Sequence, residues 1–275
     1  MLRVTGLAGL GLLAGCASER TNPAAPTEQD TASRAPREGE VAAEPPPLTR
    51  DAPDEDPTEP DAGPAPEPEA EHAAPPLRVE VICRDALGLS ATVDTGETHR
   101  LERVTLHHTA AELGANHHAP ARLRGHQRYH LDQGWPDIAY HYAVDLRGNV
   151  YELRDPGQAG DTFTEYDPMG HLLVVCEGNY DIEQPSDAML EGVAALLAAA
   201  ATTHGVDPAT LTGHRDHASG LTCPGDALQV RLPELRTAAA GKQAGGPTEL
   251  ITLCGDDANG RVARIEAGVP EENET

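Results

Sequence analysis

Three side chains far apart in the sequence have the types needed to hold a catalytic metal ion. His107 follows an apolar segment, His214 lies in the run GHRDH, and Cys223 lies in the run LTCPGD. Two imidazoles and one thiolate give zinc three protein ligands and leave the fourth tetrahedral position to water. No short zinc-binding pattern joins the three, so spacing alone leaves ordinary core or surface histidines and a spare cysteine as the default interpretation.

Six short motifs surround these residues and share one property, which is that they occur in the order found in a single enzyme family. They are Val104–Ala110 (VTLHHTA), Asp137–Tyr142 (DIAYHY), Gly148–Glu152 (GNVYE), Cys176–Tyr180 (CEGNY), Gly213–Asp216 (GHRD) and Cys223–Gly225 (CPG). Over residues 79 to 240 the chain resembles the zinc-dependent N-acetylmuramoyl-L-alanine amidases, the family shared by peptidoglycan recognition proteins and amidase-type phage lysozymes.

The resemblance implies one zinc ion as cofactor, with His107, His214 and Cys223 as its ligands. His107 is implied rather than His108, because the first histidine of the pair aligns with the ligand; a swap of the two is the alternative. Tyr140 matches a family tyrosine that faces the metal, where it can stabilise a developing oxyanion; a core aromatic of the strand is the alternative. The implied reaction is hydrolysis of the amide between N-acetylmuramic acid and L-alanine in peptidoglycan.

The residues that handle the leaving-group proton depart from the family pattern. Many members carry lysine or threonine two residues before the third ligand, where this chain has Leu221 with Thr222 beside it. The central-strand glutamate of some members corresponds to Val175, and we expect Glu177 to face the other way. Thr222, His217 and Tyr140 are the candidates for this role, and ordinary loop polarity is the alternative for Thr222 and His217. Tyr140 and Thr222 are the residues we assign to catalysis. A non-catalytic peptidoglycan-binding receptor or tether with the same fold is the alternative function.

A substrate groove is expected near the loops that flank the first ligand. Trp135, His117 and Asn116 are the residues we assign to substrate binding there. Trp135 is the only tryptophan in the chain, and its alternative role is a buried anchor after the preceding helix.

The expected elements alternate between strands and helices, which predicts an α/β domain with a central mixed sheet flanked by helices. Strands are expected at 77–83, 101–106 and 172–175, with a hairpin at 138–144 and 150–153. Helices are expected at 121–131, at 187–203 with Ser186 or Asp187 as the cap, and finally at 226–240, where Pro233 should kink or break the helix.

Composition separates this domain from a long acidic segment before it. The chain has 45 acidic and 20 basic residues and a net charge of -25, which argues against nucleic acid as a partner. Residues 16–76 are rich in proline, alanine and glutamate, lack aromatic side chains, and are expected to form a disordered tether. The predicted organisation is therefore this tether, a single zinc amidase domain at 77–242 and a C-terminal extension at 243–275, as a monomer.

The N-terminus and the cysteines predict an exported lipoprotein. Residues 1–15 resemble a secretory signal peptide, and the run LLAGC ending at Cys16 resembles the bacterial lipobox, so Cys16 is the expected lipidation site. Ala17 and Ser18 after this cysteine resemble an outer-membrane address, so a lipid anchor would hold the protein on the periplasmic side of the outer membrane. Export implies an oxidising compartment, in which Cys83 and Cys254 are the expected disulfide pair, with two unpaired buried thiols as the alternative. Cys176 is expected to be buried and free.

Overall fold

The computed structural model describes residues 76–91 and 96–269. The predicted signal peptide, Cys16 and the predicted tether up to residue 75 lie outside the described residues. Within the described ranges, no helix combines the length and the apolar character needed to cross a bilayer.

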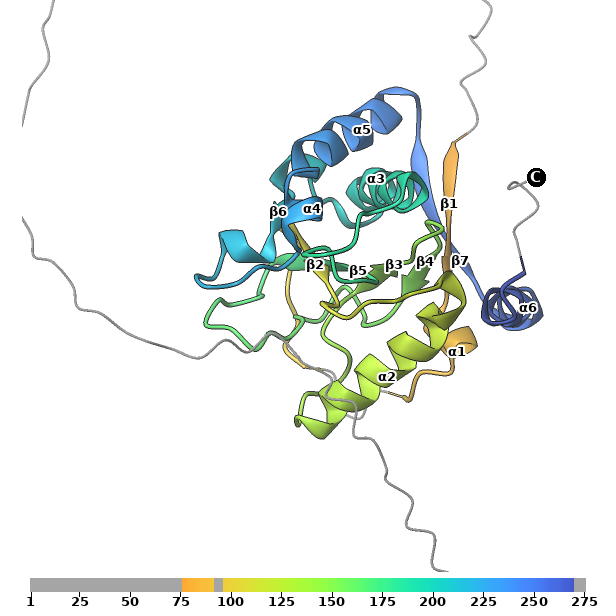
Figure 1. Ribbon diagram of the computed structural model, residues 1–275. Helices are drawn as coiled ribbons and strands as arrows, with labels where there is room; N and C mark the ends of the chain where they lie inside the picture. The colour runs from red at the N-terminus through yellow and green to blue at the C-terminus, as the bar shows by residue number, and fades with distance from the viewer. Residues whose placement is uncertain (1–75, 92–95, 270–275) are drawn as a thin grey trace, which may run out of the picture. The chain divides into compact units, whose positions relative to one another are not determined.

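The predicted central mixed sheet is confirmed and has seven strands (Figure 1). Its strand order is β6-β2-β5-β3-β4-β1-β7, and only the β3–β4 pair is antiparallel. The strands are β1 (Leu77–Ile82), β2 (Arg103–His108), β3 (Tyr142–Val144), β4 (Val150–Glu152), β5 (His171–Cys176), β6 (Thr212–Gly213) and β7 (Thr248–Leu253).

Helices cover both faces of this sheet. They are α1 (Arg84–Leu87), α2 (Ala119–Asp132), α3 (Asp187–His204), α4 (Asp226–Gln229), α5 (Leu232–Ala244) and α6 (Gly255–Glu266). Figure 1 shows α3 and α5 on one side of the sheet and α1 and α2 on the other. On β5, Val174 packs in the apolar cluster under α3, whereas Val175 packs in the cluster under α2. Burial on both faces explains why the β5 segment is continuously apolar.

Local signals account for the start of α3 and for the break before α5. The Ser186 side chain accepts a hydrogen bond of 3.1 Å from the Met189 backbone N–H and so caps α3. The helix predicted at 226–240 is divided into α4 and α5, with Pro233 in the first turn of α5. Proline suits that position because the first turn leaves its backbone N–H groups without partners inside the helix.

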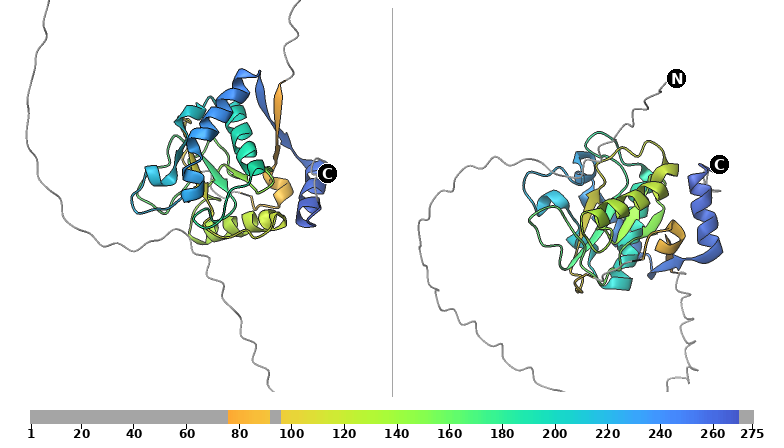
Figure 2. Two further views of the ribbon diagram at one scale, coloured as in Figure 1. Left: turned by 45° about the horizontal axis from the view of Figure 1, so that its top comes forward. Right: turned by 90° about the horizontal axis from the view of Figure 1, so that it is seen from below.

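The C-terminal segment is part of the sheet, which corrects the predicted boundary at residue 242. Strand β7 pairs in parallel with β1 along all six of its residues, and α6 follows it. The helix predicted to be the last is therefore followed by another strand and another helix. In Figure 2, α6 lies beside α1 at the edge of the domain.

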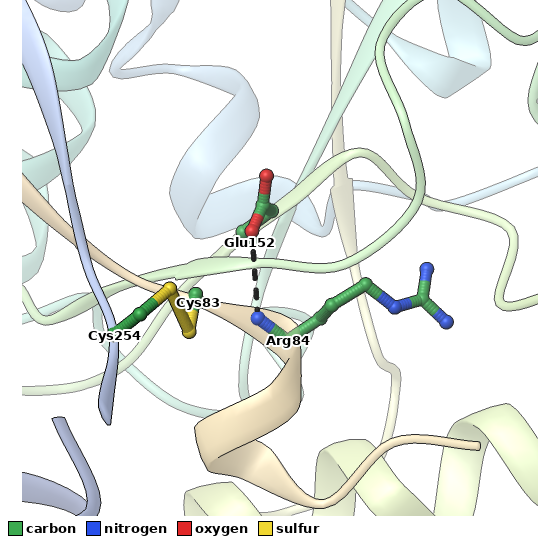
Figure 3. Close-up of a disulfide and its surroundings, with 4 residues drawn as sticks. All are labelled: Cys83, Arg84, Glu152 and Cys254. Carbon is green, nitrogen blue, oxygen red and sulfur yellow. Dashed lines mark hydrogen bonds between the residues drawn. A yellow bond between two sulfur atoms is a disulfide. The ribbon is translucent and has the colours of Figure 1, made fainter. Parts of the chain in front are cut away.

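A disulfide joins the ends of these two paired strands (Figure 3). Cys83 directly follows β1 and Cys254 directly follows β7, so the bond continues a ladder in which Cys83 N donates to Leu253 O at 3.0 Å. Beside it, the Arg84 backbone N–H donates to Glu152 Oε2 on β4 at 3.5 Å. Cys176, at the end of β5, is a buried free thiol.

Candidate metal centre

The sheet brings His107, His214 and Cys223 to one place. Strand β6 pairs with β2 so that Gly213 stands opposite Leu106. The residue after each is a histidine, His107 within β2 and His214 directly after β6. The two imidazole rings lie 4.6 Å apart between centroids. A backbone hydrogen bond of 2.8 Å from Arg215 N to Cys223 O folds the following loop back, and the candidate ligand atoms of the three residues all lie within 4.8 Å of one another.

The donor set fits a zinc ion. Cys223 Sγ lies 3.6 Å from His107 Nδ1. Zinc–sulfur and zinc–nitrogen bonds of about 2.3 and 2.1 Å at a tetrahedral angle would place the two donors roughly 3.6 Å apart. The other nitrogen of His107, Nε2, is buried and has no hydrogen-bond partner among the described residues. Hydrogen bonding alone therefore does not account for the burial of this imidazole.

Both candidate histidine ligands are held in the neutral form that binds metals. Burial, reinforced by the nearby His214, lowers the pKa of His107 well below its ordinary value. Burial, reinforced by His217, lowers the pKa of His214 to about 4. At neutral pH both imidazoles therefore offer a lone pair without first losing a proton.

An open cavity of about 780 Å³ adjoins the three residues. One part of its lining comes from α2, which contributes His126, Tyr129 and His130. Another part comes from the loop at 161–164, and Tyr140 also lines the space. The Tyr140 ring lies 5.2 Å from the His107 ring between centroids, so the structure brings Tyr140 together with the candidate ligands.

Two threonines of the 161–164 loop hold His214 from the cavity side. The hydroxyls of Thr164 and Thr162 lie 3.1 and 3.3 Å from His214 Nε2. Such contacts fix the orientation and the tautomer of a ligating imidazole. The sequence carried no signal for either residue, because a polar threonine in a loop is the ordinary expectation.

Trp135 supports the cavity from behind. Its ring lies 4.2 Å from that of Phe163 and 4.8 Å from that of His130, both of which line the cavity, although Trp135 itself does not. Phe163 is an exposed residue of this lining. The exposed aromatic surface at the cavity is therefore that of Phe163, which the sequence analysis did not assign.

Four other residues that the sequence analysis singled out lie elsewhere, and none of them lines the cavity. Thr222 donates its hydroxyl to Asp181 at 2.7 Å, and His217 is bonded to the Thr212 hydroxyl at 2.7 Å. Asn116 donates to Asp145 at 3.0 Å, and His117 is exposed on the 3-10 turn Asn116–His118.

The expectation that Glu177 faces away from the site is wrong. Residues two apart on an extended segment point to the same side, so Glu177 shares the face of Val175. In the structure Glu177 is fully buried, with Oε1 3.7 Å from Nε2 of His126 on α2. A glutamate therefore lies behind the wall of the cavity, two positions beyond the one expected from the resemblance.

Comparison with known proteins places this geometry in a family. A family model described as N-acetylmuramoyl-L-alanine amidase matches residues 97–226. Peptidoglycan-recognition protein SC2 of Drosophila melanogaster is 32% identical over 153 residues, which are 54% of this chain and 82% of that protein. N-acetylmuramoyl-L-alanine amidase of Sus scrofa is 39% identical over 111 residues, which are 39% of this chain and 18% of that protein. The chain therefore spans less than a fifth of the pig relative.

Solved structures show the same fold. The Drosophila peptidoglycan recognition protein SD superposes with a TM-score of 0.52 at 26% identity, covering 56% of this chain and 93% of that one. Peptidoglycan recognition protein LE, solved in complex with tracheal cytotoxin, superposes with a TM-score of 0.51 at 25% identity, covering 56% of this chain and 92% of that one. The chain matches 82% of recognition protein SC2 at 32% identity and has the fold of the recognition proteins. It therefore belongs to the N-acetylmuramoyl-L-alanine amidase family, which includes the peptidoglycan recognition proteins.

Proposed function

We propose that the chain is a zinc-dependent amidase that hydrolyses the bond between N-acetylmuramic acid and L-alanine in peptidoglycan. The observation that carries the proposal is the convergence of His107, His214 and Cys223, all buried, at the wall of an open cavity. A receptor that only binds has no need of three such donors. Relatives named as amidases support the reaction class.

The chain's own residues then have distinct tasks. His107, His214 and Cys223 hold the ion, which when bound supplies an acidified water and polarises the amide carbonyl. Tyr140 lines the cavity beside His107, so its hydroxyl can donate to the oxygen that becomes negatively charged. Thr162 and Thr164 keep His214 in one orientation. The substrate enters the space that α2 and the 161–164 loop line together.

Peptidoglycan as the substrate is supported by the relatives. The structure of protein LE is a complex with tracheal cytotoxin, described as monomeric peptidoglycan of the diaminopimelic acid type. The cavity of this chain combines aromatic rings with neutral imidazoles, which suits a ligand that is part sugar and part peptide.

The test is peptide release from purified sacculi. Zinc-loaded protein should free stem peptides whose new N-terminus is L-alanine, detected by mass spectrometry, and Cys223→Ala should free none. Sacculi that retain the zinc-loaded protein without losing peptide would instead establish the non-catalytic receptor.

We also propose that the mature protein is anchored by lipid at Cys16 on the periplasmic side of the outer membrane. The support is the lipobox-like run LLAGC and the acidic, proline-rich segment that follows it. Metabolic labelling with palmitate should mark the wild-type chain, and Cys16→Ala should abolish the label. A labelled Cys16→Ala chain would refute the assignment.

A further inference from the structure

A fully buried carboxylate stands behind the cavity wall without the partners that buried carboxylates normally have. Glu177 is 0% exposed, and neither of its carboxylate oxygens has a hydrogen-bond partner within the described part of the chain. Its Oε1 lies 3.7 Å from Nε2 of His126. That nitrogen atom is also buried and has no hydrogen-bond partner in the described part of the chain. Burying such a group costs free energy, so a polar pair in this position calls for a reason other than stability.

His126 connects this pair to the cavity. Its side chain is 15% exposed, and it lines the same cavity as His107, His214 and Cys223. Since Nε2 lies toward Glu177, the carboxyl group stands directly behind an imidazole that lines the cavity. A buried acid stands behind the catalytic histidine of triad hydrolases in the same way, although that acid is ionised.

The backbone holds both residues in place. Glu177 N donates to Val144 O at 3.0 Å, which continues the sheet beyond the end of β5. The next residue, Gly178, donates to the Thr109 hydroxyl at 3.0 Å. His126 lies one turn before His130 on α2, with the two rings stacked at 6.5 Å between centroids.

The proton of the pair resides on the carboxyl group at neutral pH. Burial raises the pKa of Glu177 to about 8, with the Arg122 guanidinium opposing the rise and Asp145 adding to it. Burial lowers the pKa of His126 to about 4, and Arg122 adds to this effect. The other titratable groups near the pair are the His130 imidazole, the phenols of Tyr151 and Tyr180, and the Cys176 thiol. Burial shifts the pKa of each of these four toward its uncharged form.

We propose that His126 and Glu177 form a proton-transfer pair that protonates the amine leaving the cleaved amide. His126 faces the substrate, and Glu177 is a positioning and proton-supplying residue that acts through it. The Nδ1–H bond of His126 breaks as the new N–H bond of the amine forms. At the same time the O–H bond of Glu177 breaks and an Nε2–H bond forms, which leaves Glu177 ionised until water in the cavity restores its proton as the products depart.

The pair supplies a proton donor at the cavity, which the residues just before Cys223 do not provide. Leu221 has no proton to give, and Thr222 is bonded to Asp181 outside the cavity. His217 is bonded to Thr212 and likewise does not line the cavity. This inference rests on the proposed amidase function.

The test is the pH dependence of stem-peptide release by zinc-loaded protein, with bound zinc quantified in parallel. Wild-type activity should fall as the pH rises through about 8, because the protonated carboxyl is the active form. Glu177→Gln and His126→Gln should each release peptide roughly 10²–10⁴-fold more slowly near pH 7, with unchanged zinc content and no alkaline fall. Glu177→Asp keeps a titratable carboxyl and should retain the fall. His204→Gln is the matched control and should behave as wild type. It alters a half-buried histidine that bonds Tyr142, whose ring packs in the apolar cluster under α3.

Two results would overturn the proposed proton-transfer pair, and only one of them would also overturn the proposed amidase function. A Glu177→Gln protein with wild-type rate and wild-type alkaline fall overturns the pair and leaves the amidase function standing. A zinc-loaded wild-type protein that releases no peptide overturns both. A measurement that needs no variant is carbon NMR of the Glu177 carboxyl in the wild-type protein, which should titrate near pH 8. A Glu177 carboxyl that is already ionised at about pH 6, well below that value, refutes the pair even if every variant fails to fold.

Discussion

Cys223 Sγ lies 3.6 Å from His107 Nδ1, although 116 positions separate the two residues in the chain. The parallel pairing of β6 with β2 and the backbone bond from Arg215 to Cys223 together create this contact. Both are backbone interactions of the chain, and neither needs a metal ion to form. The donor set is therefore assembled by the fold, and its ability to hold zinc can be tested one ligand at a time.

Removal of Cys223 should abolish tight zinc binding. Cys223→Ala deletes the thiolate, and we expect at least about a 100-fold loss of zinc affinity, since even changes behind the ligands cost roughly 10- to 100-fold. Zinc titration with a chromophoric chelator measures the loss. Cys176→Ala, which removes the other buried thiol, should bind one zinc ion as wild type does. Full zinc occupancy in Cys223→Ala would contradict the assigned ligand set.

Tyr140→Phe should slow peptide release without changing zinc content. Tyr140 lines the cavity, and in the proposed reaction its hydroxyl donates to the oxyanion; loss of one such donor costs roughly 10²–10³-fold in rate. Tyr142→Phe is the matched control, because the Tyr142 hydroxyl bonds His204 at 2.9 Å and its ring packs in the cluster under α3. Equal rates for the two variants would remove Tyr140 from the reaction.

His141 should make the domain acid-sensitive. Its Nδ1 accepts from Leu173 N at 2.8 Å, so its Nε2 donates to Gln158 O at 2.9 Å, and burial lowers its pKa from 6.5 to about 3. The unfolded chain therefore binds one more proton between these two values, and the free energy of unfolding should fall as the pH drops from 6.5 toward 3.

His141→Phe tests that relationship. It leaves the buried N–H of Leu173 and the partly buried carbonyl of Gln158 without this partner, so we expect a loss of about 1–3 kcal/mol at neutral pH and an acid slope smaller by about one proton. Urea unfolding at several pH values measures both quantities. His117→Ala, at an exposed histidine, should change neither. An unchanged acid slope in His141→Phe would show that His141 is not buried in its neutral form.

The disulfide should stabilise the edge of the sheet more than it affects the site. Cys83→Ala with Cys254→Ala releases a link across 171 positions, and loss of such a bond typically costs about 2–5 kcal/mol. In thermal unfolding, reductant should lower the Tm of the wild type by as much as the double substitution lowers it without reductant. Zinc binding should be retained, because neither cysteine lines the cavity. A reductant-insensitive wild type would contradict the bond.

Features that depend on neighbouring residues followed from the sequence. The Ser186 cap, the interruption near Pro233 and the continuously apolar β5 all have local physical causes, namely a side-chain acceptor, a missing N–H and burial on both faces. The ordered motifs predicted His107, His214 and Cys223 as candidate ligands because the family resemblance supplied a partnership that spacing alone did not, and the fold brings the three together.

Features that depend on which distant surfaces meet were decided by the tertiary structure. Strand β7 joins the sheet through a partner strand that lies 171 positions earlier, and no local pattern encodes that choice. Asn116 looked available for substrate, yet Asp145 takes up its side chain. Glu177 could be assigned to a face by alternation, but its pairing with His126 exists only because α2 docks on that face. Chain chemistry specifies which groups are present, and packing determines which of them remain unpaired beside the cavity.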